Sequence, residues 1–336
     1  MIILGIETSC DETSAAIIKE KKRQLHLKSN IVASSISLHI KTGGIIPENA
    51  AREQIKYILP VIQEALKEAK IDLSDVDAIA VTYGPGLIGS LLVGVETAKT
   101  ISMVLNKPLI PVNHMLGHIY ANFINNSKIE FPALALVVSG GHTDLLLLNN
   151  HGDFELLGGT RDDAAGEAFD KIGRLLGLPY PGGPVVEKRA KLGNSKRFIF
   201  PRPLVGSNDF DFSFSGLKTA VLREVKSLKE LDEQTINDIC AGVQYAIINV
   251  LIKKTLKAAE KYNVKAILLA GGVAANETLQ KEFIQNIKNQ IPNIKFFAPA
   301  KNLCTDNGAM IAAAAFYNYK EIPWQEIVAD PQLYFI

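Results

Sequence analysis

The stretch Ile2-Ile3-Leu4-Gly5-Ile6-Glu7-Thr8-Ser9-Cys10-Asp11, followed by an apolar segment at 15–18, sets the architecture of this chain. An apolar run, a small polar corner and a second apolar run are typical of a strand, a tight turn and a returning strand. The same succession recurs about 130 residues later, at 133–138, Ser139-Gly140-Gly141-His142-Thr143 and 145–148. Two such openings predict a duplicated fold with two similar lobes.

Strand and helix patterns alternate along the rest of the chain, which indicates the α/β class. The further elements that we expect are helices at 50–70, 87–105 and 307–319 and strands at 77–81 and 266–270. With 336 residues the chain is long enough for about two domains. We expect residues 1–112 and about 307–327 to form a first lobe, and residues 113–306 to form a second. Residues 150–215 are rich in Gly, Pro and Asp and are expected to be an insertion in the second lobe.

Composition argues against several classes of protein. The formal net charge of +1 disfavours nonspecific coating of nucleic acid, although it leaves room for a local basic patch. Three cysteines far apart in the sequence suit a reducing compartment and offer neither a disulfide framework nor a metal knuckle. The N-terminus turns acidic at Glu7, unlike a targeting peptide, and no apolar run approaches the roughly eighteen residues of a membrane span. We therefore expect a soluble, cytoplasmic protein.

Small residues at the corners suggest sites for phosphate groups. Exposed backbone N–H groups at such a corner can bind phosphate oxygens, and Gly140 and Gly141 would let the backbone approach a ligand and take positive φ. A third corner, Gly271-Gly272-Val273-Ala274-Ala275-Asn276, follows a buried strand, and Asn276 offers both a donor and an acceptor. For any single corner a tight turn is the better explanation. Three of them together resemble the actin, sugar-kinase and heat-shock ATPase superfamily, whose members bind ATP in a cleft between two ribonuclease-H-like lobes.

His114 and His118 point to a metal ion. Four residues apart on a helix, they would project from one face and could share one ion, with a carboxylate such as that of Asp306 completing the set. The peptidase pattern H-E-x-x-H places a glutamate after the first histidine as general base, whereas here Met115 stands there. The pair is therefore suited to bind a metal but ill suited to activate water for peptide hydrolysis. By itself, a histidine pair at this spacing also arises by chance.

Specific motifs extend the resemblance to one family. The segments that are similar to the TsaD family lie at 5–13, 113–118, 138–143, 161–171, 180–184, 212–220, 270–276 and 305–310. Within them, 162–170 and 212–219 resemble the bacterial form of the family. The resemblance implies two ribonuclease-H-like lobes with a ligand cleft between them. It also implies transfer of the threonylcarbamoyl group from threonylcarbamoyl-adenylate to N6 of an adenosine, with release of AMP. That adenosine lies on the 3′ side of the anticodon in tRNAs that read codons beginning with A.

The resemblance also assigns roles to residues. It implies that His114, His118 and Asp306 bind one divalent metal ion, Fe(2+) or alternatively Zn(2+). It further implies that the adenylate is held by Val137, Val138, Ser139, Gly140, Gly141, Asp170, Gly183, Glu187 and Asn276. An adenine amine is a poor nucleophile, and a cation that polarises the carbamoyl carbonyl or balances charge on the leaving AMP would compensate. Asp11 and Glu12 are the candidates for removing the amine proton, although a solvated turn or a helix cap explains each of them equally well.

The partners that the family resemblance implies are tRNA, a TsaB-like paralogue and a TsaE-like P-loop ATPase, with no membrane. Exposed faces of the first lobe are the usual place for the paralogue. Lys41, Arg52 and Lys56 are candidates for a tRNA-facing patch, against the simpler interpretation that they only aid solubility. Cys10 lies beside the first corner, and we expect it to pack rather than to react.

Three other functions compete with transfer. An ATP-dependent kinase or ATPase would turn over ATP without partners, but it leaves the histidine pair without a purpose. A metallopeptidase would cleave protein, and Met115 in place of glutamate argues against it. An inactive scaffold paralogue is expected to lack the histidine pair altogether.

Overall fold

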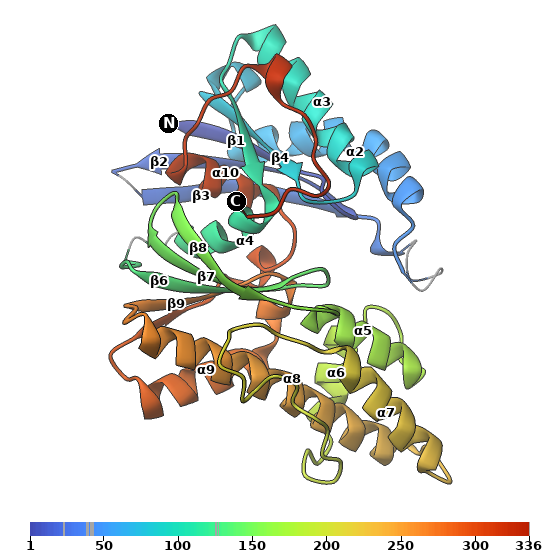
Figure 1. Ribbon diagram of the computed structural model, residues 1–336. Coiled ribbons are helices and arrows are strands. Elements are labelled where there is room, and N and C mark those ends of the chain that lie inside the picture. The colour runs from blue at the N-terminus through green and yellow to red at the C-terminus, as the bar shows by residue number, and fades with distance from the viewer. Residues whose placement is uncertain (23, 38–39, 41–43, 125, 127, 336) are drawn as a thin grey trace. The chain divides into compact units, whose positions relative to one another are not determined.

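The computed structural model describes residues 1–22, 24–37, 40, 44–124, 126 and 128–335. The chain divides into two compact units (Figure 1). Met1–Ile129 and Pro299–Ile336 form the first unit, and Glu130–Ala298 form the second. Each unit is built around one five-stranded sheet.

Helices cover both faces of the sheet of the first unit. In spatial order its strands are β3 (Gln24–Ser34), β2 (Glu12–Lys21), β1 (Ile2–Glu7), β4 (Ala78–Gly84) and β5 (Leu109–Asn113). Helices α2 (Pro47–Ala69) and α3 (Ile88–Leu105) pack on the face that carries Leu4 and Ile6. Helix α10 (Gly308–Tyr317) packs on the opposite face, against Gly5. Because both faces are covered, β1 is a continuous apolar run rather than an alternating one.

The sheet of the second unit repeats this arrangement. In spatial order its strands are β10 (Lys295–Phe297), β9 (Ala266–Ala270), β6 (Ala133–Val138), β7 (Thr143–Asn150) and β8 (Asp153–Gly159). The opening strand pairs antiparallel with the next strand and parallel with a later one in both sheets. The duplicated α/β fold expected from the two openings is therefore confirmed. The helices of this unit are α5 (Ala165–Leu175), α6 (Gly182–Ala190), α7 (Ser215–Ser227), α8 (Glu233–Lys261) and α9 (Glu277–Gln290).

The observed boundaries differ from those expected at 112/113 and 306/307. Strand β5 continues directly into α4 (His114–Tyr120), and α4 packs closely on α10, since a Cβ atom at Gly117 would lie 2.7 Å from Cδ1 of Ile311. Residues 113–129 and 299–306 therefore belong to the first unit. The segment expected as an insertion at 150–215 contains β8, which is a strand of the repeated sheet. The rest of that segment, after Gly159, contains helices α5 and α6.

Helices α3 and α8 have the length and mean hydropathy of a membrane span. Neither is an uninterrupted apolar run, because α3 contains Glu96 and Lys99 and α8 contains seven charged residues. In α8, 83% of the most apolar window is buried inside the fold, as in the core helix of a soluble protein, whereas the value for α3 is 33%. Length and composition alone are therefore weak evidence for a span.

Candidate functional site

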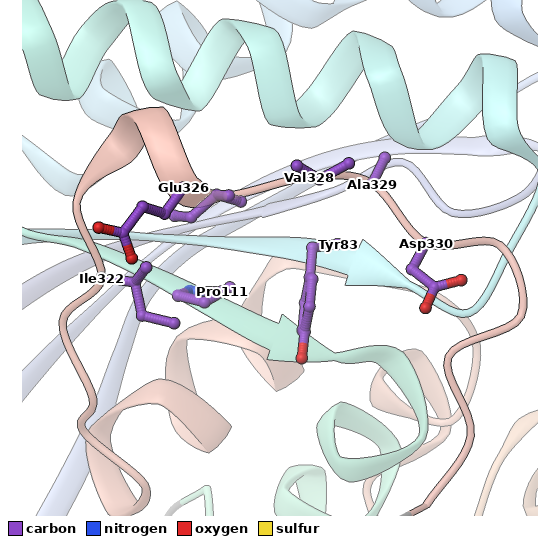
Figure 2. A pocket seen from close by; sticks show the side chains of 8 residues that line it. Tyr83, Pro111, Ile322, Glu326, Val328, Ala329 and Asp330 are labelled. Atoms are coloured by element: carbon purple, nitrogen blue, oxygen red, sulfur yellow. The ribbon is translucent and has the colours of Figure 1, made fainter.

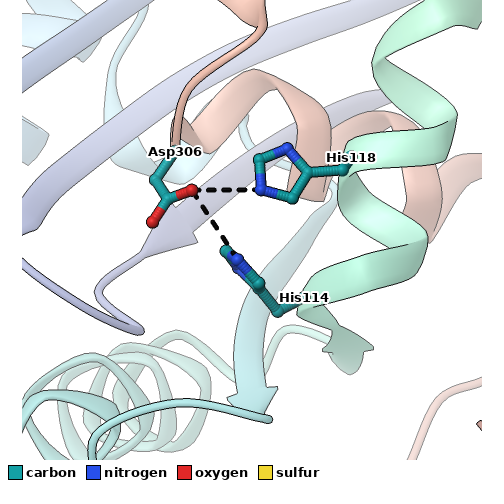
Figure 3. A group of neighbouring side chains, drawn as sticks. All are labelled: His114, His118 and Asp306. Atoms are coloured by element: carbon teal, nitrogen blue, oxygen red, sulfur yellow. Dashed lines mark ion pairs between the residues drawn. The ribbon is translucent and has the colours of Figure 1, made fainter. Parts of the chain in front are cut away.

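Two histidines and a carboxylate meet in the first unit (Figure 3). His114 and His118 lie one turn apart on α4, whose start is capped by the Asn113 side chain, an acceptor for two backbone N–H groups of the first turn. Asp306 precedes α10, and its Oδ1 atom lies 3.1 Å from His118 Nε2 and 3.6 Å from His114 Nε2. Met115, which follows the first histidine, is buried, and its thioether cannot serve as a general base.

The separations of the two histidine nitrogens from Asp306 fit one metal ion. All three ligand atoms lie within 4.8 Å of one another. Two ligands that each lie about 2.1 Å from a shared ion are separated by about 3.0 to 3.4 Å at angles between 90° and the tetrahedral value. The separations of 3.1 and 3.6 Å to Asp306 are close to this range. Two imidazoles and one carboxylate also form a ligand set that suits iron and zinc.

Glu7, at the end of β1, orients the first histidine. Its Oε2 atom lies 3.2 Å from His114 Nδ1, and Ser9 Oγ lies 3.1 Å from the same nitrogen. Glu7 is fully buried and is itself held by the hydroxyl of Thr82 and the backbone N–H of Ser9. A carboxylate that accepts a hydrogen bond from Nδ1–H keeps the proton on Nδ1 and leaves the lone pair of Nε2 free for a metal. Sequence reasoning missed Glu7, although its place at the end of a buried strand was a usable signal.

Glu7→Gln is expected to weaken metal binding by about 10- to 100-fold, because the substitution removes the negative charge that orients and polarises His114. The measurement is a metal titration in competition with a chromophoric chelator. Glu64→Gln, on the exposed side of α2, is the control and should bind metal as the parent does. An unchanged metal affinity in Glu7→Gln would show that the contact to His114 is only structural.

The centre carries an excess of negative charge. Burial, together with the charges of Asp306 and Asp11, raises the pKa of Glu12 well above its usual range. Burial lowers the pKa of His114, but the charges of Asp306 and Glu7 outweigh it and raise that pKa to about 9. The arrangement thus favours a positive charge between the two imidazoles and Asp306, as a bound cation would supply.

The first corner, at residues 8–11 between β1 and β2, is hydrogen-bonded to α2 by one side chain. Gln54 Nε2 donates to the carbonyl oxygens of Thr8, Cys10 and Glu12 at 3.3, 3.1 and 2.9 Å. Burial and the neighbouring carboxylates raise the pKa of the Cys10 thiol, chiefly through burial. The thiol therefore stays protonated, which agrees with a packing role rather than a nucleophilic one. Asp11 and Glu12 lie at this corner, within the same unit as the histidines.

The corner after β6 in the second unit is closed by Ser139. Its N–H donates to the carbonyl of His142, and its hydroxyl accepts from the N–H groups of Gly141 and His142. Gly140 and Gly141 are exposed, and a Cβ atom on either would meet none of the described atoms within 4 Å. The corner therefore has room for a ligand. Neither glycine takes positive φ, contrary to expectation, because the Ser139 hydrogen bonds close this turn without it.

The third corner requires glycine at one position. Gly271 has φ of 85°, and a Cβ atom there would lie 2.4 Å from the carbonyl oxygen of Val138. Strand β9 therefore passes close to the end of β6, where Val137 pairs with Ala270. The second and third corners lie side by side in the second unit.

Asp170 anchors the start of α6. Its Oδ1 atom accepts hydrogen bonds from the N–H groups of Gly182 and Gly183 at 2.7 and 3.2 Å. Burial raises the pKa of Asp170, and these two hydrogen bonds oppose the effect. Asp170 and Gly183, which were predicted as ligand-binding residues, are thus direct neighbours.

Glu187 and Asn276 meet at the start of α9. Glu187 Oε1 accepts from the N–H of Glu277, and Asn276 Oδ1 accepts from the N–H of Leu279, both at 2.9 Å. The amide nitrogen of Asn276 donates to Gln244 Oε1 at 3.2 Å. The donor and the acceptor of the Asn276 amide therefore both have partners within the fold. Its capping role was missed, although an Asn directly before an apolar-periodic helix is a recognised signal.

The basic patch expected in the first lobe is not supported. Arg52 pairs with Glu48 and Lys56 pairs with Glu53, so each charge is neutralised on the surface of α2. Lys41 lies outside the described residues.

The fold and this centre define a class of protein: a two-lobed α/β protein of actin- and ATPase-like fold with a candidate metal centre. The crystal structure of full-length HypF in its phosphate- and nucleotide-bound form shares this fold. Its TM-score is 0.63 at 13% identity, over 94% of this chain and 55% of HypF. HypF from T. kodakarensis gives a TM-score of 0.63 at 15% identity, over 94% of this chain and 47% of that protein.

The chain belongs to the TsaD family, whose model, tRNA N6-adenosine threonylcarbamoyltransferase, matches residues 26–313. A relative with that name from Syntrophomonas wolfei is 51% identical over 318 residues, which cover 95% of this chain and 92% of the relative. Another from Thermosipho melanesiensis is 49% identical over 333 residues, or 99% of each chain. The family resemblance noted in the sequence is therefore confirmed.

Proposed function

We propose that this chain transfers the threonylcarbamoyl group of threonylcarbamoyl-adenylate to N6 of an adenosine in tRNA and releases AMP. The observation that carries the proposal is the cluster of His114, His118 and Asp306 in a chain of the TsaD family. Relatives that match over nearly their full length bear the name of this activity. The target is the adenosine 3′ of the anticodon in tRNAs that read codons beginning with A.

The three residues would hold one divalent ion, Fe(2+) or alternatively Zn(2+). Three protein ligands leave coordination positions open for substrate oxygens, as is typical of catalytic sites. When bound, the ion supplies Lewis-acid polarisation of the carbamoyl carbonyl or charge balance for the leaving phosphate. Glu7 supports this role because it keeps Nε2 of His114 directed at Asp306.

The transfer requires one proton acceptor. A bond forms from N6 to the carbamoyl carbon, and the bond from that carbon to the phosphate oxygen breaks with its electron pair leaving on AMP. One proton must then leave N6. Asp11 and Glu12 are the proposed acceptors, since both lie at the corner that shares a unit with the histidines and that Gln54 holds in place.

The adenylate would bind in the second unit along the corners at the ends of β6 and β9. The exposed glycines Gly140 and Gly141 support this placement, since they leave room for close approach to the backbone. The other proposed contacts are the backbone of Val137, Val138 and Ser139 and the residues Asp170, Gly183, Glu187 and Asn276.

Asp170→Ala is expected to raise the KM for threonylcarbamoyl-adenylate by at least about tenfold. Loss of the carboxylate leaves the N–H groups of Gly182 and Gly183 without their acceptor, and such a loss costs about 1–3 kcal/mol. Steady-state kinetics measure the effect. Metal content should stay at the parent level, because Asp170 lies in the other unit from the histidines. Asp170→Asn keeps one acceptor oxygen for these N–H groups but removes the charge. A KM near the parent value in this variant would indicate that Asp170 positions the start of α6. A raised KM would indicate that its charge contacts the adenylate. An unchanged KM in Asp170→Ala would refute both roles.

The proposed protein partners are a TsaB-like paralogue and a TsaE-like ATPase. Helices α2 and α3 pack closely, since a Cβ atom at Gly89 would lie 3.3 Å from Ala51 Cβ. Beside this contact they expose large apolar side chains at helical spacing: Ile55, Leu59, Ile88 and Leu92. We propose this face as the docking surface of the paralogue, since contiguous exposed apolar side chains mark interaction sites.

Nucleoside mass spectrometry tests the proposed function. Unmodified tRNA is incubated with the chain, its two partners, threonylcarbamoyl-adenylate and Fe(2+) or Zn(2+). We expect N6-threonylcarbamoyladenosine, and we expect its loss after exhaustive chelation and its return when metal is restored. A folded, partner-bound chain that forms no modified nucleoside would refute the proposal. ATP consumption by the chain alone would favour a kinase or ATPase instead.

A further inference from the structure

Helix α7 in the second unit carries a surplus of unneutralised positive charge. Between Ser215 and Ser227 it holds Lys218, Arg223 and Lys226 but only one acid, Glu224. All three cations are exposed. Among the residues that the structure describes, none of them has an ion-pair partner, whereas seven other cations of this unit do.

The orientation of α7 is set by its buried side and by its start. Leu217 and Val221, one turn apart, are buried, so Arg223 and Lys226 project from the opposite side and Lys218 from its flank. The Asp162 carboxylate accepts four hydrogen bonds from this start, at 2.6 to 3.1 Å: from the N–H groups of Phe214 and Ser215 and the hydroxyls of Ser213 and Ser215. A carboxylate at a helix start also interacts favourably with the helix dipole. The cations therefore stand on a firmly held surface.

The start of α7 is connected to the corner after β6. Asp162 lies three residues before Ala165, whose N–H donates to the hydroxyl of Thr143 at 2.9 Å. The next N–H, of Gly166, donates to the carbonyl of Ser139 at 3.1 Å. Three residues of chain span at most about 11 Å. The basic side of α7 thus begins a short distance from the corner that is proposed to hold the adenylate.

We infer that Lys218, Arg223 and Lys226 form the surface on which the phosphate backbone of the tRNA substrate binds. The inference rests on the proposed function and names a surface for its second substrate. Exposed cations without an ion-pair partner are suited to bind RNA phosphates, since no existing pair with an acid has to be broken first. Such contacts position the RNA without reading its sequence. Asp162 then acts as a positioning residue, because it holds the helix and does not itself touch the RNA.

The test compares two triple variants of equal charge change. Lys218→Glu/Arg223→Glu/Lys226→Glu alters α7, and Lys253→Glu/Lys281→Glu/Lys288→Glu alters exposed lysines of α8 and α9. Each is assembled with the partner proteins, and its affinity for unmodified tRNA is measured by fluorescence anisotropy at several salt concentrations. We expect the α7 variant to bind at least about tenfold more weakly, with a salt slope reduced by about 2 to 3. The control variant should show a smaller loss and a slope near that of the parent. The KM for the adenylate should not change in either.

Further outcomes separate this inference from the proposed function. Lys218→Gln/Arg223→Gln/Lys226→Gln removes the charges without introducing repulsion and should show the same reduced slope. If the parent modifies tRNA while the α7 and control variants bind it equally, the inference is wrong and the proposed function stands. If the parent forms no modified nucleoside, the proposed function is wrong, and the inference that rests on it is wrong as well. Normal tRNA affinity together with loss of a protein partner would assign the surface of α7 to that protein instead.

Discussion

Replacing His114 and His118 together by alanine should abolish metal binding and lower the rate of threonylcarbamoyl transfer by at least about 1,000-fold. The substitution removes two of the three atoms that converge on one point, and a single carboxylate does not hold a divalent ion firmly. A Lewis acid contributes several kcal/mol of transition-state stabilisation, and about 4 kcal/mol corresponds to this factor. Metal content by mass spectrometry and modified nucleoside per unit time measure the two effects.

A second double variant of this chain, which also replaces two histidines by alanine, serves as the control. His26→Ala/His151→Ala also removes two imidazoles, one from the exposed part of β3 and one from the turn after β7, and it should keep both metal and activity. Circular dichroism should give the same secondary structure for both double variants. Metal loss with unchanged product formation would leave the transferase intact and refute a catalytic role for the ion. Retained metal would show that His114 and His118 are not its ligands.

Gly5→Ala should destabilise the first unit by about 3 kcal/mol, the upper part of the range for overpacking. A Cβ atom at Gly5 would lie 2.1 Å from the carbonyl oxygen of Gly308 and 2.7 Å from the backbone nitrogen of Ala312. These are backbone atoms of α10, so the whole helix would have to move away from β1. The same helix follows Asp306 directly, so we also expect weaker metal binding.

Trp324 reports on this change because it is the single tryptophan and packs against the core of the first unit. Urea denaturation followed by its fluorescence should show a clearly lower midpoint in Gly5→Ala. Gly206→Ala is the control, since a Cβ atom there would meet none of the described atoms within 4 Å. A midpoint equal to that of the parent in Gly5→Ala would show that α10 accommodates the methyl group.

The sequence by itself determined the elements and their repetition. The apolar run before the first corner and its counterpart at 133–138 became β1 and β6, each paired with the strand that follows it. The spacing of His114 and His118 placed both on one side of a helix, because helical periodicity is a local property. The helix expected at 307–319 likewise became α10, whose start the Asn307 side chain caps.

The tertiary structure decided which distant groups meet. Asp306 joins the histidines only because the small residues Gly5, Gly117 and Gly308 let α10 pack against β1 and α4. Glu7 reaches His114 across 107 positions of sequence, and no local pattern encodes that contact. The same holds for Asp162 and the start of α7, which are 52 positions apart at Phe214. Periodicity depends on neighbouring residues alone, whereas these contacts depend on how closely whole elements pack, and that is a property of the assembled core.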